Sequence, residues 1–437
     1  MSREMKNSGV EWIEEIPEDW TPIKLKHTSN IVRGGSPRPI EAYLTDGTGY
    51  NWIKIGDTLK GNKYIKSTKQ KIISEGLSKT RYVKKDTLLL TNSMSYGEAY
   101  ILDIDGCIHD GWLAFSDYQN ANKEYLYYCL ISDFCKNQFG SIVDGGVVSN
   151  LNIEKVKNAM VLLPPPTEQQ QIANFLDRKC TAIDTAIKKT KKSIEKLEEY
   201  KKAVITKAVT KGLNPDVEMK DSGVKFVGMI PVNWTVQRLK FCLSESLKYG
   251  ANESGINYNE NLPRYIRITD ITEDGKLKEA DKLSLTIEQA NNYILKDKDI
   301  LLARSGATVG KSFLYKKEYG IAAFAGYLIK ATVNEKLLPE YFNYITQSSY
   351  YLLWKDWIFS QATIQNIGAD KYNQLPTVIP SIEEQIDITN YLDNKCAKIA
   401  EAISRQKSAI EKLEEYRKSL IYNAVTGKID CRNEVIE

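Results

Sequence analysis

The sequence has few of the residues that build metal and redox sites. Its 437 residues include two histidines, His27 and His109, and seven cysteines, no two of which form a CxxC pair. A zinc site needs clustered cysteine or histidine ligands, and a disulfide framework has an even number of closely spaced cysteines. We therefore expect reduced thiols, no metal site and no cofactor. His109, in a Cys-Ile-His-Asp stretch, is expected to be a structural loop histidine.

Long apolar runs are absent as well. The longest candidate, Gly320 to Ile329, is about half of the roughly 18 residues that a membrane helix needs. The charged N-terminus has no apolar stretch of the secretory type. We expect no membrane segment and a cytoplasmic location. With 42% hydrophobic and 27% charged residues, the composition is that of a globular protein, and the length suggests two or three domains.

The most informative feature is a tandem repeat. SGVEWIEEIPEDW at 8–20 reappears as SGVKFVGMIPVNW at 222–234, and WIKIGD at 52–57 matches YIRITD at 265–270. The globular parts of the two halves have diverged, whereas the segments that follow them are nearly identical. Each half is therefore expected to fold as one globular domain followed by one helical segment.

Both near-identical segments have the features of long helices. Thr167 to Gln170 and Ser381 to Glu384 fit capping boxes placed just after proline. The apolar residues beyond them keep a heptad, and IEKLEEYKK at 194–202 returns as IEKLEEYRK at 410–418. Two helices with one stripe in one chain are expected to pair as an antiparallel coiled coil, in preference to packing separately on their own domains. The expected seam residues are Leu176, Ile183, Ile187, Ile194, Leu197, Leu392, Ile399, Ile403, Ile410 and Leu413.

The globular halves indicate mixed α/β domains. Short runs typical of strands, such as 50–55 and 300–303, alternate with helix-like stretches, such as 122–135 and 339–354. No ordered βαβ series points to a dinucleotide fold, so the fold class that we expect is α+β. The expected divisions are a first domain at 1–166, a central helix at 167–211, a second domain at 212–381, and a C-terminal helix and tail at 382–437.

Taken in order, these motifs resemble the specificity (S) subunits of type I restriction–modification systems. The resemblance rests on the SGV-x5-IP-x2-W opening, the W/Y-I-K/R-I-x-D strand, LLARSGATVGK at 301–311 and AVTGK at 424–428, and it covers essentially the whole chain. It implies two target-recognition domains, each reading half of a split site in double-stranded DNA. It also implies that the helices set the half-site spacing and dock two methyltransferase (M) subunits, to which restriction (R) subunits can be added. Such a subunit is not itself an enzyme.

The charge distribution supports DNA binding only in part. The net charge is +4, and the basic helical segment 178–211 holds 11 Lys/Arg against 4 Asp/Glu. In the first domain, residues 54–85 carry 10 Lys/Arg against two acidic residues, whereas residues 87–154 carry 2 against 9. Such polarity fits a domain with one DNA-facing side, and it equally fits a solvated charged face. We expect stable DNA binding to need phosphate contacts from partner subunits.

Base and phosphate contacts are expected from side chains in and after the matched strands. Arg, Asn and Ser supply the hydrogen bonds that base edges require, while Lys more often holds phosphate. The residues that we expect to bind DNA are Lys54, Arg81, Asn92, Ser93, Tyr96, Arg267, Arg304, Ser305, Thr308 and Lys311. In this alignment Thr91 to Gly97 stands where Arg304 to Gly310 stands in the second half. The GGSPR stretch at 34–38 fits a phosphate-cradling loop or a turn, and the turn is favoured.

Two other function classes stay open. Ser305-x4-Gly310-Lys311-Ser312 nearly spells a P-loop, but it lacks the first glycine and is followed by a strand-like Ser-Phe-Leu-Tyr instead of a helix. Nucleotide binding by the isolated chain would indicate such an NTPase. A coiled-coil adaptor with two protein-binding heads would have the same helices but no sequence-selective contact with DNA.

Overall fold

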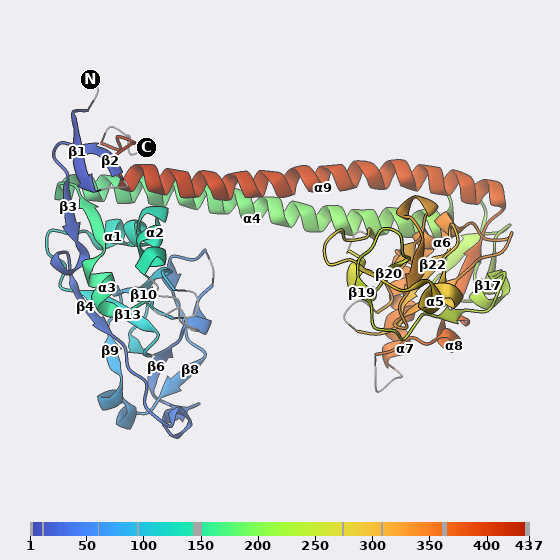
Figure 1. Ribbon diagram of the computed structural model, residues 1–437, viewed down its shortest axis with the longest axis horizontal. Coiled ribbons are helices and arrows are strands. Elements are labelled where there is room, and N and C mark those ends of the chain that lie inside the picture. Colours follow the sequence, from blue (N-terminus) through green and yellow to red (C-terminus); the bar gives the residue numbers. More distant parts are fainter. Residues whose placement is uncertain are drawn as a thin grey trace. The chain divides into compact units, whose positions relative to one another are not determined.

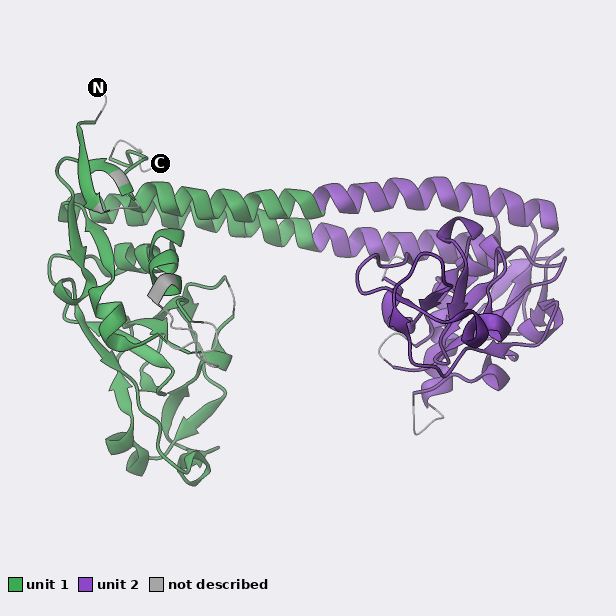
Figure 2. Cartoon of the chain, viewed as in Figure 1, with its two compact units in different colours: residues 1–191, 407–437 green, residues 192–406 purple. Residues whose placement is uncertain are grey.

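A computed structural model describes residues 3–10, 13–59, 61–93, 96–142, 151–272, 275–306, 309–360 and 365–432. The chain divides into two compact units (Figure 2). The first unit comprises Met1–Lys191 and Lys407–Glu437, and the second comprises Lys192–Gln406. Both units contain part of each long helix. The described part of the chain contains no helix that is long and apolar enough to span a membrane.

The first unit is built on two mixed β-sheets. In its described residues one sheet has the order β4-β13-β10-β11-β7 and the other the order β5-β8-β6-β12-β9. Strand β10 is buried along its whole length, which explains its unbroken apolar run Leu88–Leu90. The strand bounds are β4 Asn30–Arg33, β5 Leu44–Thr45, β6 Tyr50–Ile53, β7 Tyr64–Ile65, β8 Gln70–Ile72, β9 Arg81–Val83, β10 Leu88–Thr91, β11 Ala99–Leu102, β12 Gly106–Ile108 and β13 Trp112–Ser116.

Three α-helices and two pairs of antiparallel strands complete the described part of this unit (Figure 1). Strand β1 pairs with β2, and β3 pairs with β14. The predicted helical stretch 122–135 is divided by Ser132, whose hydroxyl accepts a hydrogen bond from the Cys135 amide and thereby caps the second helix. The bounds are β1 Met5–Val10, β2 Ile13–Pro17, β3 Thr21–Lys24, α1 Lys123–Ile131, α2 Asp133–Ile142, α3 Ile153–Asn158 and β14 Met160–Leu163.

The second unit repeats this plan, with four strands in each main sheet of its described residues where the first unit has five. Its described residues form sheets of order β18-β25-β22-β23 and β19-β21-β20-β24, with β15 paired to β16 and β17 to β26. Strand β20 runs parallel to β24, as β6 runs parallel to β12 in the first unit. Ser348 caps α7 as Ser132 caps α2. The bounds are β15 Met219–Asp221, β16 Met229–Pro231, β17 Thr235–Arg238, β18 Lys248–Tyr249, β19 Ile256–Asn257, β20 Arg264–Ile266, β21 Leu283–Ser284, α5 Ile287–Ala290, β22 Ile300–Ala303, β23 Ser312–Leu314, β24 Ala322–Phe324, β25 Leu328–Ala331, α6 Pro339–Ile345, α7 Ser349–Ser360, α8 Ala369–Tyr372 and β26 Pro376–Ile379.

The two long helices, α4 (Pro166–Lys211) and α9 (Ile382–Val425), pair in opposite directions. In the first unit Arg417 Nη1 donates to Asp184 Oδ1 at 2.7 Å, and Gln171 Nε2 donates to the Arg432 carbonyl at 3.5 Å. In the second unit Gln406 Nε2 donates to Ser193 Oγ at 3.1 Å. The buried seam residues are Leu176, Ile183, Ile187, Leu392 and Ile399, and the half-buried ones are Ile194, Leu197, Ile403, Ile410 and Leu413. The predicted α+β class and antiparallel coiled coil are confirmed.

Only one of the two predicted capping boxes forms. Ser381 precedes α9, its hydroxyl accepts from the Glu384 amide at 3.3 Å, and its own amide donates to Glu384 Oε2 at 3.2 Å. The box predicted from Thr167 to Gln170 is wrong, because α4 begins one residue earlier, at Pro166. Proline suits the first helical position, where its missing N–H would have no partner. Gln170 instead accepts a hydrogen bond from Asn122 Nδ2 at 2.8 Å.

Candidate nucleic-acid interface

In the first unit, several predicted DNA-binding residues converge on the turn 109–111 between β12 and β13. Asn92 Nδ2 donates to the Asp110 carbonyl at 3.2 Å, and Arg33 Nε donates to the same carbonyl at 2.9 Å. Arg81 Nε in turn donates to the Arg33 carbonyl at 2.9 Å. A glycine is required at the end of this turn, since a Cβ on Gly111 would lie 3.0 Å from Ser93 Oγ and closer still to His109. The turn therefore gathers Arg81, Asn92 and Ser93, which are distant in sequence.

His109 occupies this turn as a structural residue. Its Nδ1 lies 2.8 Å from the Gly111 amide nitrogen, and its Nε2 lies 3.1 Å from the Ile55 amide nitrogen. A neutral imidazole accepts one of these two hydrogen bonds. Burial lowers the pKa of His109, opposed in part by the nearby Asp110 carboxylate. The described residues contain no group of three or more His, Cys, Asp or Glu side chains that could hold a metal ion.

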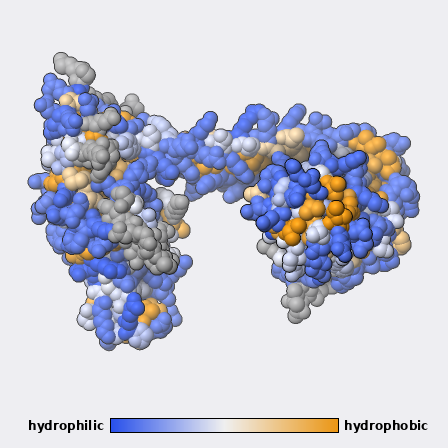
Figure 3. Space-filling model, in the orientation of Figure 1, coloured by the Kyte–Doolittle hydropathy of each residue, from blue (hydrophilic) through white to orange (hydrophobic). Residues whose placement is uncertain are grey.

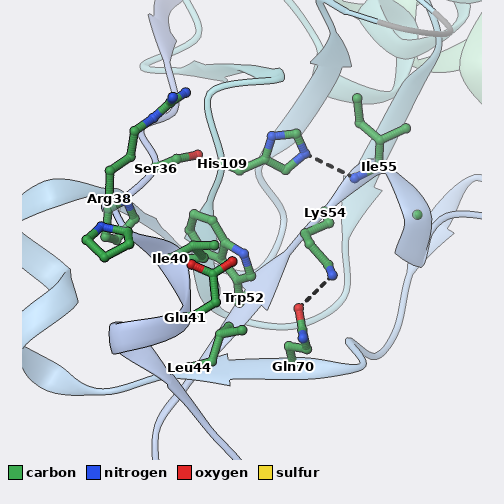
Figure 4. A pocket seen from close by; sticks show the side chains of 13 residues that line it. Ser36, Arg38, Ile40, Glu41, Leu44, Trp52, Lys54, Ile55, Gln70 and His109 are labelled. Atoms are coloured by element: carbon green, nitrogen blue, oxygen red, sulfur yellow. Dashed lines mark hydrogen bonds between the residues drawn. The ribbon is translucent and has the colours of Figure 1, made fainter.

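A cavity of about 750 Å³ opens beside the same turn (Figure 4). Lys54 Nζ donates to Gln70 Oε1 at 2.6 Å inside it, and Ser36 Oγ donates to Asp110 Oδ1 at 2.7 Å near its edge. Lys54 also begins a short 3₁₀ turn that is closed by the Asp57 carboxylate, which accepts from the Lys54 amide at 2.9 Å. The cavity therefore places Lys54 within the same surface region as the turn 109–111.

The glycine-rich stretch at 34–38 is not the favoured turn: it is irregular backbone that follows β4, with a bend beginning at Arg38. The Gly34 amide donates to the Trp112 carbonyl at 2.9 Å, and the Gly35 amide donates to the Ile108 carbonyl at 3.1 Å. Both amides are therefore already paired. A Cβ on Gly34 would lie 2.1 Å from the His109 carbonyl oxygen, so glycine is required for this close approach.

Asn92 and Arg304 occupy equivalent positions in the two units. In each unit this residue's amide donates to a turn carbonyl, and its own carbonyl accepts from the residue after an asparagine. The hydrogen bonds are Asn92 N to Gly111 O, Leu151 N to Asn92 O, Arg304 N to Tyr327 O and Ile367 N to Arg304 O. The sequence alignment that placed Thr91 opposite Arg304 is thus wrong by one residue. The cause is one extra residue in the second loop. The Gly310 amide donates to the Ala303 carbonyl there, whereas in the first loop the Gly97 amide donates to the Thr91 carbonyl.

Both equivalent positions hold polar atoms without partners. The Arg304 guanidinium lies 5.0 Å from the centre of the Tyr249 ring, and its buried Nε has no hydrogen-bond partner among the described residues. Within the same part of the structure, Asn92 Oδ1 and Asn366 Oδ1 are also buried and unpartnered. Buried polar atoms are usually paired in folded proteins, so atoms left over at matched sites indicate a place for a ligand or ordered water.

The remaining predicted residues have mixed environments. Arg267 is held by Asp270, to which it donates from Nε and Nη2 at 3.1 and 2.8 Å, and by the Asp281 carbonyl at 2.8 Å. The bond to Asp270 raises the pKa of Arg267. Ser305 bridges to Asn366, Lys311 is half-buried, and Tyr96 packs against the core of the first unit. Thr308 lies outside the described residues.

The sequence did not reveal Gln70, Asp110 or Tyr249. Gln70 meets this region only because β8 pairs with β6, which sets Gln70 opposite Trp52. Asp110 acts mainly through its backbone carbonyl, which carries no sequence signal. The sequence contained one signal for Tyr249: it precedes Gly250 in the second half, as Arg33 precedes Gly34 in the first half.

Exposed aromatic side chains occur in both units. In the first unit the exposed aromatics include Tyr50 and Tyr82, and in the second they include Tyr249 and Tyr327. The visible face of the first unit is mostly hydrophilic, whereas apolar side chains gather on the visible face of the second (Figure 3). Exposed basic residues of the segment 54–85 are Lys66, Lys69, Lys71, Lys79, Arg81, Lys84 and Lys85.

Comparison with known proteins identifies the family. The model of the type I restriction modification DNA specificity domain matches residues 17–199 and again residues 240–412. The chain belongs to this family. The specificity domain thus occurs twice, and each copy includes one of the two turn-centred sites.

Similar proteins extend over nearly the whole chain. The specificity subunit of the type I restriction enzyme StySPI from Salmonella potsdam is 20% identical, over 96% of this chain and 91% of its own length. That of the EcoBI enzyme from Escherichia coli is 22% identical, over 99% and 90%. The solved HsdS subunit from Thermoanaerobacter tengcongensis has a TM-score of 0.50 at 16% identity, covering 95% of this chain and 98% of its own. A chain solved in a study of type I complex assembly reaches a TM-score of 0.74 at 16% identity.

Proposed function

We propose that this chain is the DNA-specificity subunit of a type I restriction–modification complex, with one half of a bipartite target read by each unit. The observation that carries the proposal is the duplication of one site with different side chains. Both units place a polar residue after a buried central strand and bind it to a matching turn, yet the residue is Asn92 in one and Arg304 in the other. The same backbone arrangement with a different polar side chain in each unit fits the recognition of two different half-sites.

The DNA-binding surface that we propose surrounds these two turns. Lys54, Arg81, Asn92 and Ser93 lie around the turn 109–111, and Arg304 and Ser305 lie beside the turn 325–327. We assign base contacts first to Asn92 and Arg304, and phosphate contacts to the exposed lysines. Tyr96, Arg267, Thr308 and Lys311 remain proposed contacts. We retain 1–166 and 212–381 as the functional recognition segments and 167–211 and 382–437 as the helical ones.

The partners follow from the proposed role. The chain would direct two methyltransferase subunits and, through the complex, restriction subunits to the target, acting on DNA in the cytoplasm. Recognition is its own contribution, and the chemistry belongs to the partners. The exposed faces of α4 and α9 are the proposed docking surfaces, because their seam faces are already buried against each other.

Genome-wide mapping of methylated sites tests the proposal. Cells that carry the partner methyltransferase gene should methylate a two-part sequence with a fixed spacer only when this gene is present. A map that does not change on deletion of this gene would overturn the proposal. Assembly of the complex with no site preference would favour the coiled-coil adaptor. The P-loop alternative has lost its structural basis, because Ser312–Leu314 is a strand rather than a helix.

A further inference from the structure

The cavity of the first unit has an apolar floor and a polar end. Ile40, Leu44 and Trp52 supply the floor, and Lys54 and Gln70 meet at the polar end (Figure 4). Trp52 is only 2% exposed, so the floor is a fixed part of the core. Water is partly excluded from such a site, which strengthens the hydrogen bonds formed there.

The contact between Lys54 and Gln70 fixes which way the Gln70 amide faces. An ammonium group has no acceptor, so the atom that Gln70 turns toward Lys54 must be its carbonyl oxygen, 2.6 Å from Nζ. The Gln70 Nε2 group is then left to face elsewhere, and it has no hydrogen-bond partner among the described residues. Lys54 Nζ keeps two further N–H donors. The pair therefore offers mainly donors, on Lys54 Nζ and Gln70 Nε2, against the one remaining lone pair of Gln70 Oε1.

A pair of donors matches one base in the major groove. Guanine presents two acceptors there, N7 and O6, whereas adenine and cytosine each present a donor and thymine a single acceptor. We propose that Lys54 and Gln70 together read a guanine in the half-site bound by the first unit. This inference rests on the proposed function, and it adds the base and the reading pair.

The surroundings of the cavity favour a base edge over a phosphate. The Glu41 carboxylate lies on the cavity wall, where it would repel a phosphate and where it offsets the charge of Arg38, which lines the same cavity (Figure 4). The neighbouring Gly34 and Gly35 amides, which could otherwise bind an anion, are already paired to backbone carbonyls. An uncharged base edge meets neither obstacle.

The second unit does not have this donor pair. Arg267 stands at the position of Lys54, but its guanidinium is held by Asp270 and Asp281. Arg264 pairs with Ser284 as Asn51 pairs with Lys71, so the register places Leu283 at the position of Gln70. The Lys54–Gln70 readout is therefore confined to the first half-site.

The test uses the full complex with its methyltransferase subunits and a duplex that carries the mapped target. Each guanine of the first half-site is replaced in turn by 7-deazaguanine, which lacks the N7 acceptor. At one position we expect wild-type binding to weaken about 5- to 150-fold. Gln70→Met and Lys54→Met should each bind the normal duplex more weakly, and the same 7-deazaguanine should cause no further loss in the variant that lacks the donor to N7. Ser67→Ala, at an exposed position three residues before Gln70, should keep the full response to 7-deazaguanine.

Each failure has its own meaning. Retained preference for the second half-site shows that a variant complex is folded, and the conservative Lys54→Arg variant should recover part of the lost binding. A first half-site without guanine, or variants that respond to 7-deazaguanine like wild type, would overturn this inference while leaving the proposed function intact. A wild-type complex with no two-part site would instead overturn the proposed function.

Discussion

The indole nitrogen of Trp20 donates a hydrogen bond to Glu168 Oε2 at 3.1 Å. Trp234 Nε1 donates to Glu384 Oε1 at 3.0 Å in the same way. In each unit this bond joins the motif that opens the repeat to the first turn of a long helix, where a carboxylate is also favoured by the helix dipole. The bond fixes the globular part of each unit to its helix.

Loss of Glu168 should destabilise the first unit more than loss of Glu384 destabilises the second. Glu168 is buried and also accepts from Arg3 Nη1 and Nη2, so Glu168→Ala removes three hydrogen bonds and leaves Arg3, among the described residues, only its bond to Asp19. We expect a loss of about 2–3 kcal/mol for Glu168→Ala and about 1 kcal/mol for Glu384→Ala. Urea unfolding of both variants measures the difference. Equal losses would show that the Arg3 contact of Glu168 contributes no more than the exposed Ser381 contact of Glu384.

Arg304→Ala should weaken DNA binding by about 1–3 kcal/mol and relax one position of the second half-site, if Arg304 reads a guanine. Its unpaired Nε and its stacking on Tyr249 leave the guanidinium available to DNA. Binding to a panel of single-base variants of the target measures both effects. Lys316→Ala, at an exposed position of the same unit, is the matched control. Unchanged binding and specificity after Arg304→Ala together with Arg267→Ala would reject the assignment.

The cysteine thiols should resist alkylation in the folded protein. All seven cysteines are buried, and burial raises the pKa of Cys107 to about 11 and that of Cys180 to about 12. Because the reactive species is the thiolate, reaction with iodoacetamide at pH 8 should be slow until the chain is unfolded in urea. Mass spectrometry of the native and unfolded protein measures this. Rapid alkylation of Cys107 in the native state would contradict the described packing.

The paired helices should set the length of the spacer between half-sites. Seven residues inserted between Lys192 and Ser193, together with seven between Gln406 and Lys407, would keep the Ser193–Gln406 and Asp184–Arg417 contacts. One heptad adds about 10 Å of helix, or roughly three base pairs of about 3.4 Å each. Those three pairs also turn the duplex by about 100°.

The double insertion should therefore abolish methylation of the original site, with any remaining activity on longer spacers. An insertion in one helix alone is the control, since it breaks the seam register. Full methylation of the original site by the double variant would show that the helices do not set the spacing.

The sequence was sufficient for the architecture because the repeat and the heptad report burial directly. Ile183 and Leu392 lie in the seam where the seven-residue period placed them. The candidate site was harder to predict, because periodicity does not reveal which strands pair. Gln70 is brought to Lys54 by the β6–β8 register, and the one-residue difference between the loops that begin at Asn92 and Arg304 appears only in backbone hydrogen bonds. The Thr167 box failed because a proline can occupy the first helical position as well as precede it.

Each unit is expected to read one half of the target independently of the other. The most direct measurement replaces residues 1–166 with the equivalent segment of a related specificity subunit and maps the methylated sites again. We predict that one half-site changes to that of the donor protein, while the other half-site stays the same. A change in both half-sites, or in neither, would contradict the claim.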